Sequence, residues 1–198
     1  LDLHLEWFDE ANQVLTELYS QNREDMEVVL RLENFQEKRE DWLTLLDILR
    51  HKLELLPADE HYSVLMRLAM VQGDNLSDIH ESVATYRSLL EQFPDEEGPI
   101  DQLEQLVLAG DDKEQAYALL KPILEEKGEW ERLLISMGAF KEWVDETERK
   151  LSLLLEMAAI AENRMEDLHR AFYLAAEGLK AAPHRQDVIA LLEKIGHK

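Results

Sequence analysis

Apolar residues recur at three- and four-residue spacing along almost the whole chain. This spacing places them on one face of an α-helix, whereas a half-buried strand would alternate at every second residue. Few segments alternate in that way, and β-branched residues are scarce. The pattern therefore predicts an all-α protein. Typical apolar sets are Leu43, Leu45, Leu46, Ile48, Leu49 and Leu53, then Val83, Tyr86, Leu89 and Leu90, and later Leu151, Leu154, Leu155 and Ala158.

Turn-forming residues interrupt the helical pattern at short intervals. Such clusters stand at Pro57-Ala58-Asp59, Gly73-Asp74-Asn75, Pro94 to Pro99, Gly110-Asp111-Asp112, Gly128 and Pro183. Because glycine and proline end helices, these clusters together with the apolar pattern predict eleven helices. They lie near residues 3–20, 24–38, 40–55, 59–72, 76–92, 99–109, 112–126, 129–143, 146–161, 165–181 and 185–196. Connections this short predict antiparallel helix hairpins.

The hairpins repeat along the chain. A shift of 88 residues aligns Trp42 with Trp130, and a shift of 89 aligns Pro94 with Pro183. Further aligned pairs are Leu32 and Leu120, Glu37 and Glu125, Ala69 and Ala158, Asp78 and Asp167, and His80 and His169. The sequence therefore predicts a single helical-repeat domain over 1–198, with a partial unit at 1–20, a first unit at 21–110 and a second at 111–198. We expect hairpins stacked as a right-handed α-solenoid, each stabilising the next, and a fragment of a longer chain because the sequence begins at Leu1.

The second unit resembles a tetratricopeptide repeat. An apolar helix with small residues is followed by a turn, a second helix with alanine and an aromatic residue, and a proline after that helix: Leu151, Ala158, Ala159, Ala171, Phe172 or Tyr173, and Pro183. The segment AYALLKPILEEKGEWERLL, residues 116–134, is similar to a recurrent segment of long bacterial tetratricopeptide-like proteins. The first copy departs from it, with Asn34 in place of the proline and Glu40 in place of the glycine. The resemblance implies a non-enzymatic protein that binds partners or builds assemblies.

The chain is strongly acidic, with 43 Asp and Glu against 21 Lys and Arg and a net charge of −22. Residues 1–99 hold 23 acidic and 8 basic side chains, and residues 100–198 hold 20 and 13. This charge disfavours nucleic acid, which requires a Lys and Arg footprint. Two interpretations stay open: an acidic face for a basic protein partner, or a solvated surface that keeps the chain soluble. The longest apolar runs are too short for a membrane-spanning helix, so we expect no membrane insertion.

Catalytic and metal-binding patterns are weak. The sequence contains no G-x-S-x-G, no glycine-rich phosphate loop, no H-E-x-x-H and no cysteine. Glu166 and His169 have the E-x-x-H spacing of di-iron helical bundles, but Ser77 occupies the place of Glu166 in the first copy. Asp47 and His51 are expected to form an ordinary surface pair. We therefore predict no enzyme activity, no metal and no cofactor.

Aromatic residues and prolines are the remaining candidates. Trp7 and Phe8 near the start and Trp143 at a helix end are candidate partner-binding residues, with simple core packing as the alternative. Trp42 and Trp130 are predicted to be structural, each wedging the start of its helix against the preceding helix. Pro94 and Pro183 are expected to end helices. Pro122 lies inside a predicted helix, where a kink that curves the stack is expected, with a functional hinge as the alternative.

Two function classes remain in view. The first is a protein-interaction scaffold that binds a helix or extended peptide of a partner, basic in one interpretation, on the concave face of the solenoid. The second is a structural spacer or self-assembling module of a larger repeat protein, either monomeric or associating head to tail. The absence of cysteine leaves the compartment open. We favour the cytoplasm, with the periplasm or cell envelope as the alternative if a signal has been removed.

Overall fold

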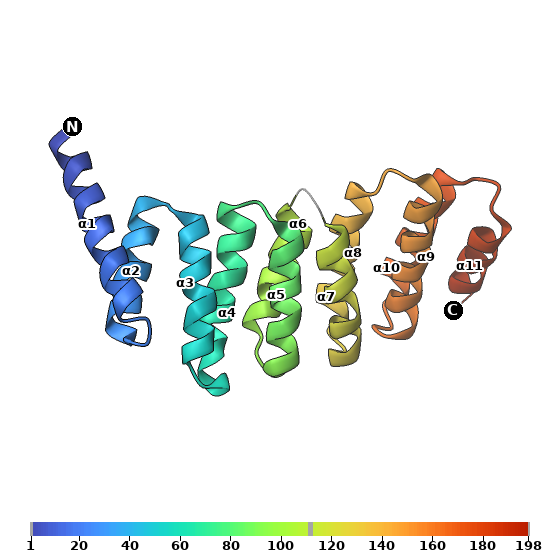
Figure 1. Ribbon diagram of the computed structural model, residues 1–198. Helices are drawn as coiled ribbons and strands as arrows, with labels where there is room; N and C mark the ends of the chain where they lie inside the picture. Colours follow the sequence, from blue (N-terminus) through green and yellow to red (C-terminus); the bar gives the residue numbers. More distant parts are fainter. Residues whose placement is uncertain (1, 111–112, 198) are drawn as a thin grey trace. The chain divides into compact units, whose positions relative to one another are not determined.

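The regular secondary structure of the described residues is all helical, as predicted. A computed structural model describes residues 2–110 and 113–197, with side chains from Trp7 onward. These residues form eleven α-helices and no strand (Figure 1). The helices are α1 (Asp2–Gln21), α2 (Met26–Arg39), α3 (Trp42–Leu55), α4 (His61–Met70), α5 (Ile79–Gln92), α6 (Gly98–Ala109), α7 (Glu114–Lys127), α8 (Trp130–Trp143), α9 (Thr147–Asn163), α10 (Leu168–Ala181) and α11 (Gln186–Gly196). A 3₁₀ turn, η1 (Ala58–Glu60), precedes α4, and a π-helical turn, η2 (Val71–Asn75), follows it.

The predicted helix bounds differ from the observed ones by at most three residues, and the largest difference lies at the starts of α5 and α10. Both helices begin late for the same reason. Ser77 and Glu166 each adopt a left-handed backbone conformation with φ of 56°, which no helix interior allows. Asp78 and Asp167 then cap the helices, and their carboxylates accept hydrogen bonds from the backbone N–H groups of Glu81 and Arg170.

Two compact units make up the chain, residues 1–99 and residues 100–198. Within the first unit, each helix from α1 to α4 packs against the next one in sequence, which ends the series at α5 (Figure 1). Within the second unit, α7 to α11 do the same. Packing between sequence neighbours is the contact pattern of helical repeats, so the local packing is consistent with such a repeat. The predicted boundaries near residues 20 and 110 follow the sequence repeat and stay a prediction.

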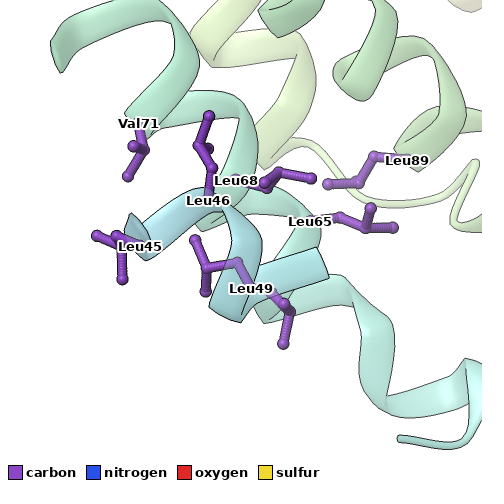
Figure 2. Packing of buried hydrophobic residues seen from close by; sticks show 8 residues of the cluster. Leu45, Leu46, Leu49, Leu65, Leu68, Val71 and Leu89 are labelled. Atoms are coloured by element: carbon purple, nitrogen blue, oxygen red, sulfur yellow. The ribbon is translucent and has the colours of Figure 1, made fainter. Parts of the chain in front are cut away.

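The core of the first unit lies mainly between α3, α4 and α5. Leu45, Leu46 and Leu49 of α3 gather with Leu65 and Leu68 of α4 in this cluster (Figure 2). Val64, Val71 and Leu89 complete its buried members. A smaller cluster joins Val29 and Leu32 of α2 to Ile48 of α3. Both clusters consist of residues at the helical spacing that the sequence displays.

Small side chains let α9 and α10 approach closely in the second unit. Ala158 of α9 and Ala171 of α10 are fully buried, as is Ala175. At Gly178, an added Cβ would lie 3.1 Å from Cδ1 of Leu151 on α9, closer than ordinary van der Waals contact. A side chain at position 178 would therefore require Leu151 to shift by a few tenths of an ångström.

Backbone geometry recurs at the separations that align the two halves of the sequence. Glu40 and Gly128, 88 residues apart, both adopt a left-handed conformation at a helix C-cap, with φ of 57° and 72°. After each of them, a backbone N–H closes the turn onto the helix: Asp41 N–H donates to Gln36 O at 3.0 Å, and Glu129 N–H donates to Leu124 O at 2.9 Å. Farther along, Asp78 N–H donates to Gln72 O at 2.8 Å and Asp167 N–H to Ala161 O at 2.9 Å, a separation of 89 residues.

One ion pair recurs with its charges exchanged. In the first unit, Glu33 of α2 binds Arg67 of α4 at 2.8 Å. At the aligned positions of the second unit, Lys121 of α7 binds Glu156 of α9. The aligned helix pairs, α2 with α4 and α7 with α9, are thus both joined by an ion pair, although the charge at each position is reversed. Such an exchange preserves the sign of the interaction, because the product of the two charges is unchanged.

Candidate protein-interaction surfaces

The histidines and carboxylates singled out in the sequence do not converge. Glu166 precedes the cap of α10 and His169 lies in its first turn, and both side chains are exposed. Among the side chains of residues 7–110 and 113–197, no three His, Asp or Glu are grouped so as to hold a metal ion. Asp47 pairs with Arg50 at 3.5 Å, while His51 Nδ1 lies 2.7 Å from the hydroxyl of Tyr19 on α1. The expected Asp47–His51 pair is thus replaced by a contact between helices.

Trp7 and Phe8 lie on α1. Trp7 is 69% exposed, and Phe8 is 44% exposed and lies tilted against Phe35 of α2 with ring centroids 5.9 Å apart. Trp7 begins a series with Ala11, Val14 and Leu18, which recur at alternating four- and three-residue spacing along α1. Val14 and Leu18 are exposed as well. We call these four residues the α1 stripe; its spacing is that of a coiled-coil seam.

Trp143 ends a short aromatic stack in the second unit. Its ring lies 5.6 Å from that of Phe140, which stacks on Tyr117 at 4.0 Å. The guanidinium of Arg149 lies 5.1 Å from the centroid of Phe140. Phe140 is buried, whereas Trp143 is 37% exposed. Trp143 therefore combines an internal packing contact with an accessible edge.

The three prolines that the sequence singled out, Pro94, Pro122 and Pro183, are exposed. Pro94 and Pro183 are exposed and each follows a helix by two residues, α5 in one case and α10 in the other. Pro122 is exposed inside α7, which continues through it to Lys127.

Trp42 and Trp130 begin α3 and α8, and both are half-buried. Trp42 packs against the cluster shared by α3, α4 and α5, not against the smaller α2–α3 cluster. Trp130 contacts Arg164, the C-cap residue that follows α9, with the guanidinium carbon 5.2 Å from the ring centroid. Both tryptophans thus meet elements that follow them in the chain. The wedge against the preceding helix stays a prediction.

An open groove of about 570 Å³ lies beside Trp42 in the first unit. Three of its lining side chains come from α4, where Tyr62, Met66 and Met70 recur at four-residue spacing. Met70 is 39% exposed. Unbranched methionine side chains adapt to ligands of different shape, which makes such walls typical of protein-binding surfaces. We call this site the Trp42 groove; Ser63, Arg67, Val71, Glu37, Asp74 and Asn75 also line it.

Charges along the Trp42 groove are partly neutralised internally. Arg67 binds Glu33 at 2.8 Å and Glu37 at 2.7 Å. The Glu33 side chain is only 3% exposed and also accepts a hydrogen bond from Lys52 at 2.7 Å. Burial of Glu33 is compatible with its charge because two cations hold it. Asp74 adds a further exposed carboxylate, so the charged groups that line the groove, Glu37, Arg67 and Asp74, sum to a negative charge.

Sequence reasoning identified Trp42 but missed its groove partners. The four-residue spacing of Tyr62, Met66 and Met70 was the available signal, and it is also the spacing of ordinary core residues. Only the position of α4 beside the start of α3 separates a groove wall from a core face. The arrangement offers apolar surface, an aromatic ring and carboxylates, which together suit the binding of another polypeptide.

No protein-family model and no curated protein sequence matches the chain. None of the helices in the described residues is both long enough and apolar enough to cross a lipid bilayer.

Proposed function

We propose that this protein is a non-enzymatic interaction scaffold that binds a helix or an extended peptide of a partner protein. The observation that carries the proposal is the Trp42 groove, where an aromatic ring, two methionines and a tyrosine line an open surface with acidic residues beside it. Exposed apolar surface edged by polar groups is a common property of protein-binding sites. The acidic composition of residues 1–99 favours a partner with basic residues.

The proposal includes a finer description of the fold. In it, the helices stack as antiparallel, tetratricopeptide-like hairpins in a right-handed α-solenoid, and the partner lies on the concave face. The recurrence of turns at separations of 88 and 89 residues supports this description, as do Pro94 and Pro183 after α5 and α10. A repeat protein of this kind presents extended surface to partners without an enclosed active site.

Affinity capture from the native lysate, followed by calorimetry with the captured protein, tests the proposal. Met70→Glu places a charge on the apolar wall of the Trp42 groove, and Ile135→Glu makes the same change at an exposed apolar residue of α8. We expect a saturable complex that weakens at least tenfold with Met70→Glu and changes less than twofold with Ile135→Glu. Equal effects of the two substitutions, or no complex at any salt concentration, would overturn it.

A second candidate function is a self-assembling or spacer module of a larger repeat protein. The α1 stripe favours it, because Trp7, Val14 and Leu18 are exposed along one line at the spacing of a coiled-coil seam. Covering such a stripe with another helix would remove apolar surface from water. The two candidates are compatible, since one concerns the Trp42 groove and the other the α1 stripe.

A further inference from the structure

The two halves of the chain place tryptophan at the same structural position. Trp42 and Trp130 each lie two residues after a left-handed residue, Glu40 or Gly128, and each is the first residue of its helix. The backbone bonds that close the two preceding turns also correspond, at 3.0 and 2.9 Å. The group that contacts Trp130 in the second half therefore indicates what kind of group can bind Trp42 in the first half.

In the second unit the chain itself supplies the ligand of the ring. Arg164 is the C-cap residue of α9, and its guanidinium lies over Trp130 at 5.2 Å from the ring centroid. The backbone N–H that follows, that of Met165, donates to Ile160 O at 3.3 Å. A guanidinium over an indole ring gains from cation–π attraction and from planar stacking.

In the first unit the corresponding residue is Asn75. The N–H of Leu76 after it donates to Val71 O at 3.1 Å, which matches the bond made by Met165. Asn75 and Trp42 both line the Trp42 groove. Asparagine is shorter than arginine and carries no charge, so it cannot reproduce the contact that Arg164 makes. Among residues 7–110 and 113–197, no cationic side chain of the protein lies over the Trp42 ring.

The surroundings of Trp42 suit an incoming cation. Glu37 and Asp74 line the groove with exposed carboxylates. Arg67 is the one cation among the groove's lining residues, and its charge is offset by Glu33 and Glu37. Tyr62, Met66 and Met70 leave room for the aliphatic stem of a long side chain, which favours apolar contact along its length.

We propose that the Trp42 groove binds an arginine side chain of the partner protein, with the guanidinium over Trp42 as Arg164 lies over Trp130. This inference rests on the proposed scaffold function and specifies the chemistry of its partner. Lysine is a weaker candidate, because its ammonium group lacks the planar surface that stacks on indole. Trp130, covered by Arg164, and Trp42, beside an open groove, occupy equivalent positions in the two units. The first would then stabilise the fold, and the second would bind a partner.

A blocked pentapeptide, acetyl-Leu-Ala-Arg-Ala-Leu-amide, is a suitable probe, and its control carries neutral citrulline in place of arginine. Binding is followed by NMR through the indole Nε1–H signals, assigned with single Trp→Phe variants. We expect the arginine peptide to shift the Trp42 signal and leave the Trp130 signal in place. The citrulline peptide should bind about fivefold more weakly. Equal affinity for the two peptides, or no response of Trp42, would overturn the inference.

Two substitutions exchange the residue types at the aligned positions 75 and 164. In the Asn75→Arg variant, the new guanidinium should lie over the Trp42 ring and abolish the response of the Trp42 signal to the peptide. The neutral Asn75→Gln variant should retain that response. Arg164→Asn should open Trp130, so that its signal begins to respond. Circular dichroism establishes that each variant is folded. If Asn75→Arg binds the peptide as the unaltered protein does, or if Trp130 stays silent in a folded Arg164→Asn variant, the inference is wrong.

The same experiments distinguish this inference from the scaffold proposal. If the captured partner depends on Met70 but the peptide does not shift Trp42, the scaffold proposal stands and the arginine assignment fails. If Trp42 responds to the peptide but no partner protein is captured, the arginine site stands and the scaffold proposal fails.

Discussion

Tyr117 lies in the second-unit core in an environment that is favourable for its ring and unfavourable for its hydroxyl. The ring stacks on Phe140, but the buried hydroxyl has no hydrogen-bond partner among the described residues. A buried polar group without a partner keeps its desolvation cost. Burial, reinforced by the nearby carboxylates of Glu156 and Glu125, raises the pKa of the Tyr117 phenol well above its ordinary value of 10.

Tyr117→Phe should therefore raise the free energy of unfolding by ~1 kcal/mol at neutral pH, because it removes the unpaired hydroxyl and retains the stacked ring. The pKa shift adds a pH dependence. Above pH 10 the unfolded chain loses the phenolic proton while the folded chain retains it, so the contribution of Tyr117 is complete below pH 10 and is lost as pH rises through the folded-state pKa. Urea unfolding at pH 7 and pH 10.5 measures both effects. A destabilised Tyr117→Phe variant at pH 7 would show that the hydroxyl has a partner.

The exchanged ion pairs also make a prediction at the residue scale. Replacing Lys121 with Glu and Glu156 with Arg would recreate in the second unit the arrangement that Glu33, Arg67 and Glu37 have in the first. We expect each single substitution to lower the free energy of unfolding by ~1 kcal/mol, since it places like charges together at a partly exposed site. The double variant should recover most of that loss. A double-mutant cycle measures the coupling, and strictly additive losses would contradict the structural equivalence of the two pairs.

At the scale of the helical elements, the turns differ in how well their residues suit the backbone. Gly128 adopts φ of 72° without strain, whereas Glu40 holds φ of 57° at the corresponding C-cap. A side chain at such a position costs about 1 kcal/mol relative to glycine. The Trp42 turn is therefore less stable than the Trp130 turn on backbone grounds alone.

Glu40→Gly should stabilise the first unit by ~0.5 kcal/mol, because relief of the left-handed conformation exceeds the added flexibility of the unfolded chain. Gly128→Ala should destabilise the second unit by ~1 kcal/mol. Chemical denaturation of both variants checks the two signs. Glu126→Ala, in the last turn of α7, is a control without a backbone constraint and should change stability by less than about 0.5 kcal/mol. A stabilising Gly128→Ala would contradict the observed turn geometry.

At the scale of the whole molecule, the α1 stripe bears on association. If the stripe mates with another helix in self-assembly, sedimentation equilibrium should detect reversible association as concentration rises. Val14→Glu should shift that equilibrium toward monomer by at least tenfold, because a carboxylate would be buried in an apolar seam. Glu17→Gln alters an exposed residue of α1 outside the stripe and serves as the control. Strictly monomeric behaviour of the unaltered protein across concentrations would remove the support for a self-assembling module.

Much of the helical architecture was predictable from the sequence. The starts of α5 and α10 are the least well predicted, because Ser77 and Glu166 adopt left-handed conformations that serine and glutamate rarely adopt. The Trp42 groove was predictable only through Trp42 itself. Its methionine wall has the periodicity of a core face, so periodicity could not reveal its exposure.

The sequence by itself determined the helical class, the helix bounds to within three residues, and the alignment of its two halves. These follow from local physics: apolar spacing, capping residues and turn chemistry act over a few neighbouring residues. Tertiary structure decided that Arg164 meets Trp130 while Asn75 leaves Trp42 beside an open groove. It also decided that Lys121 meets Glu156 where Glu33 meets Arg67. Such contacts join side chains from different helices, and their distances depend on how those helices pack.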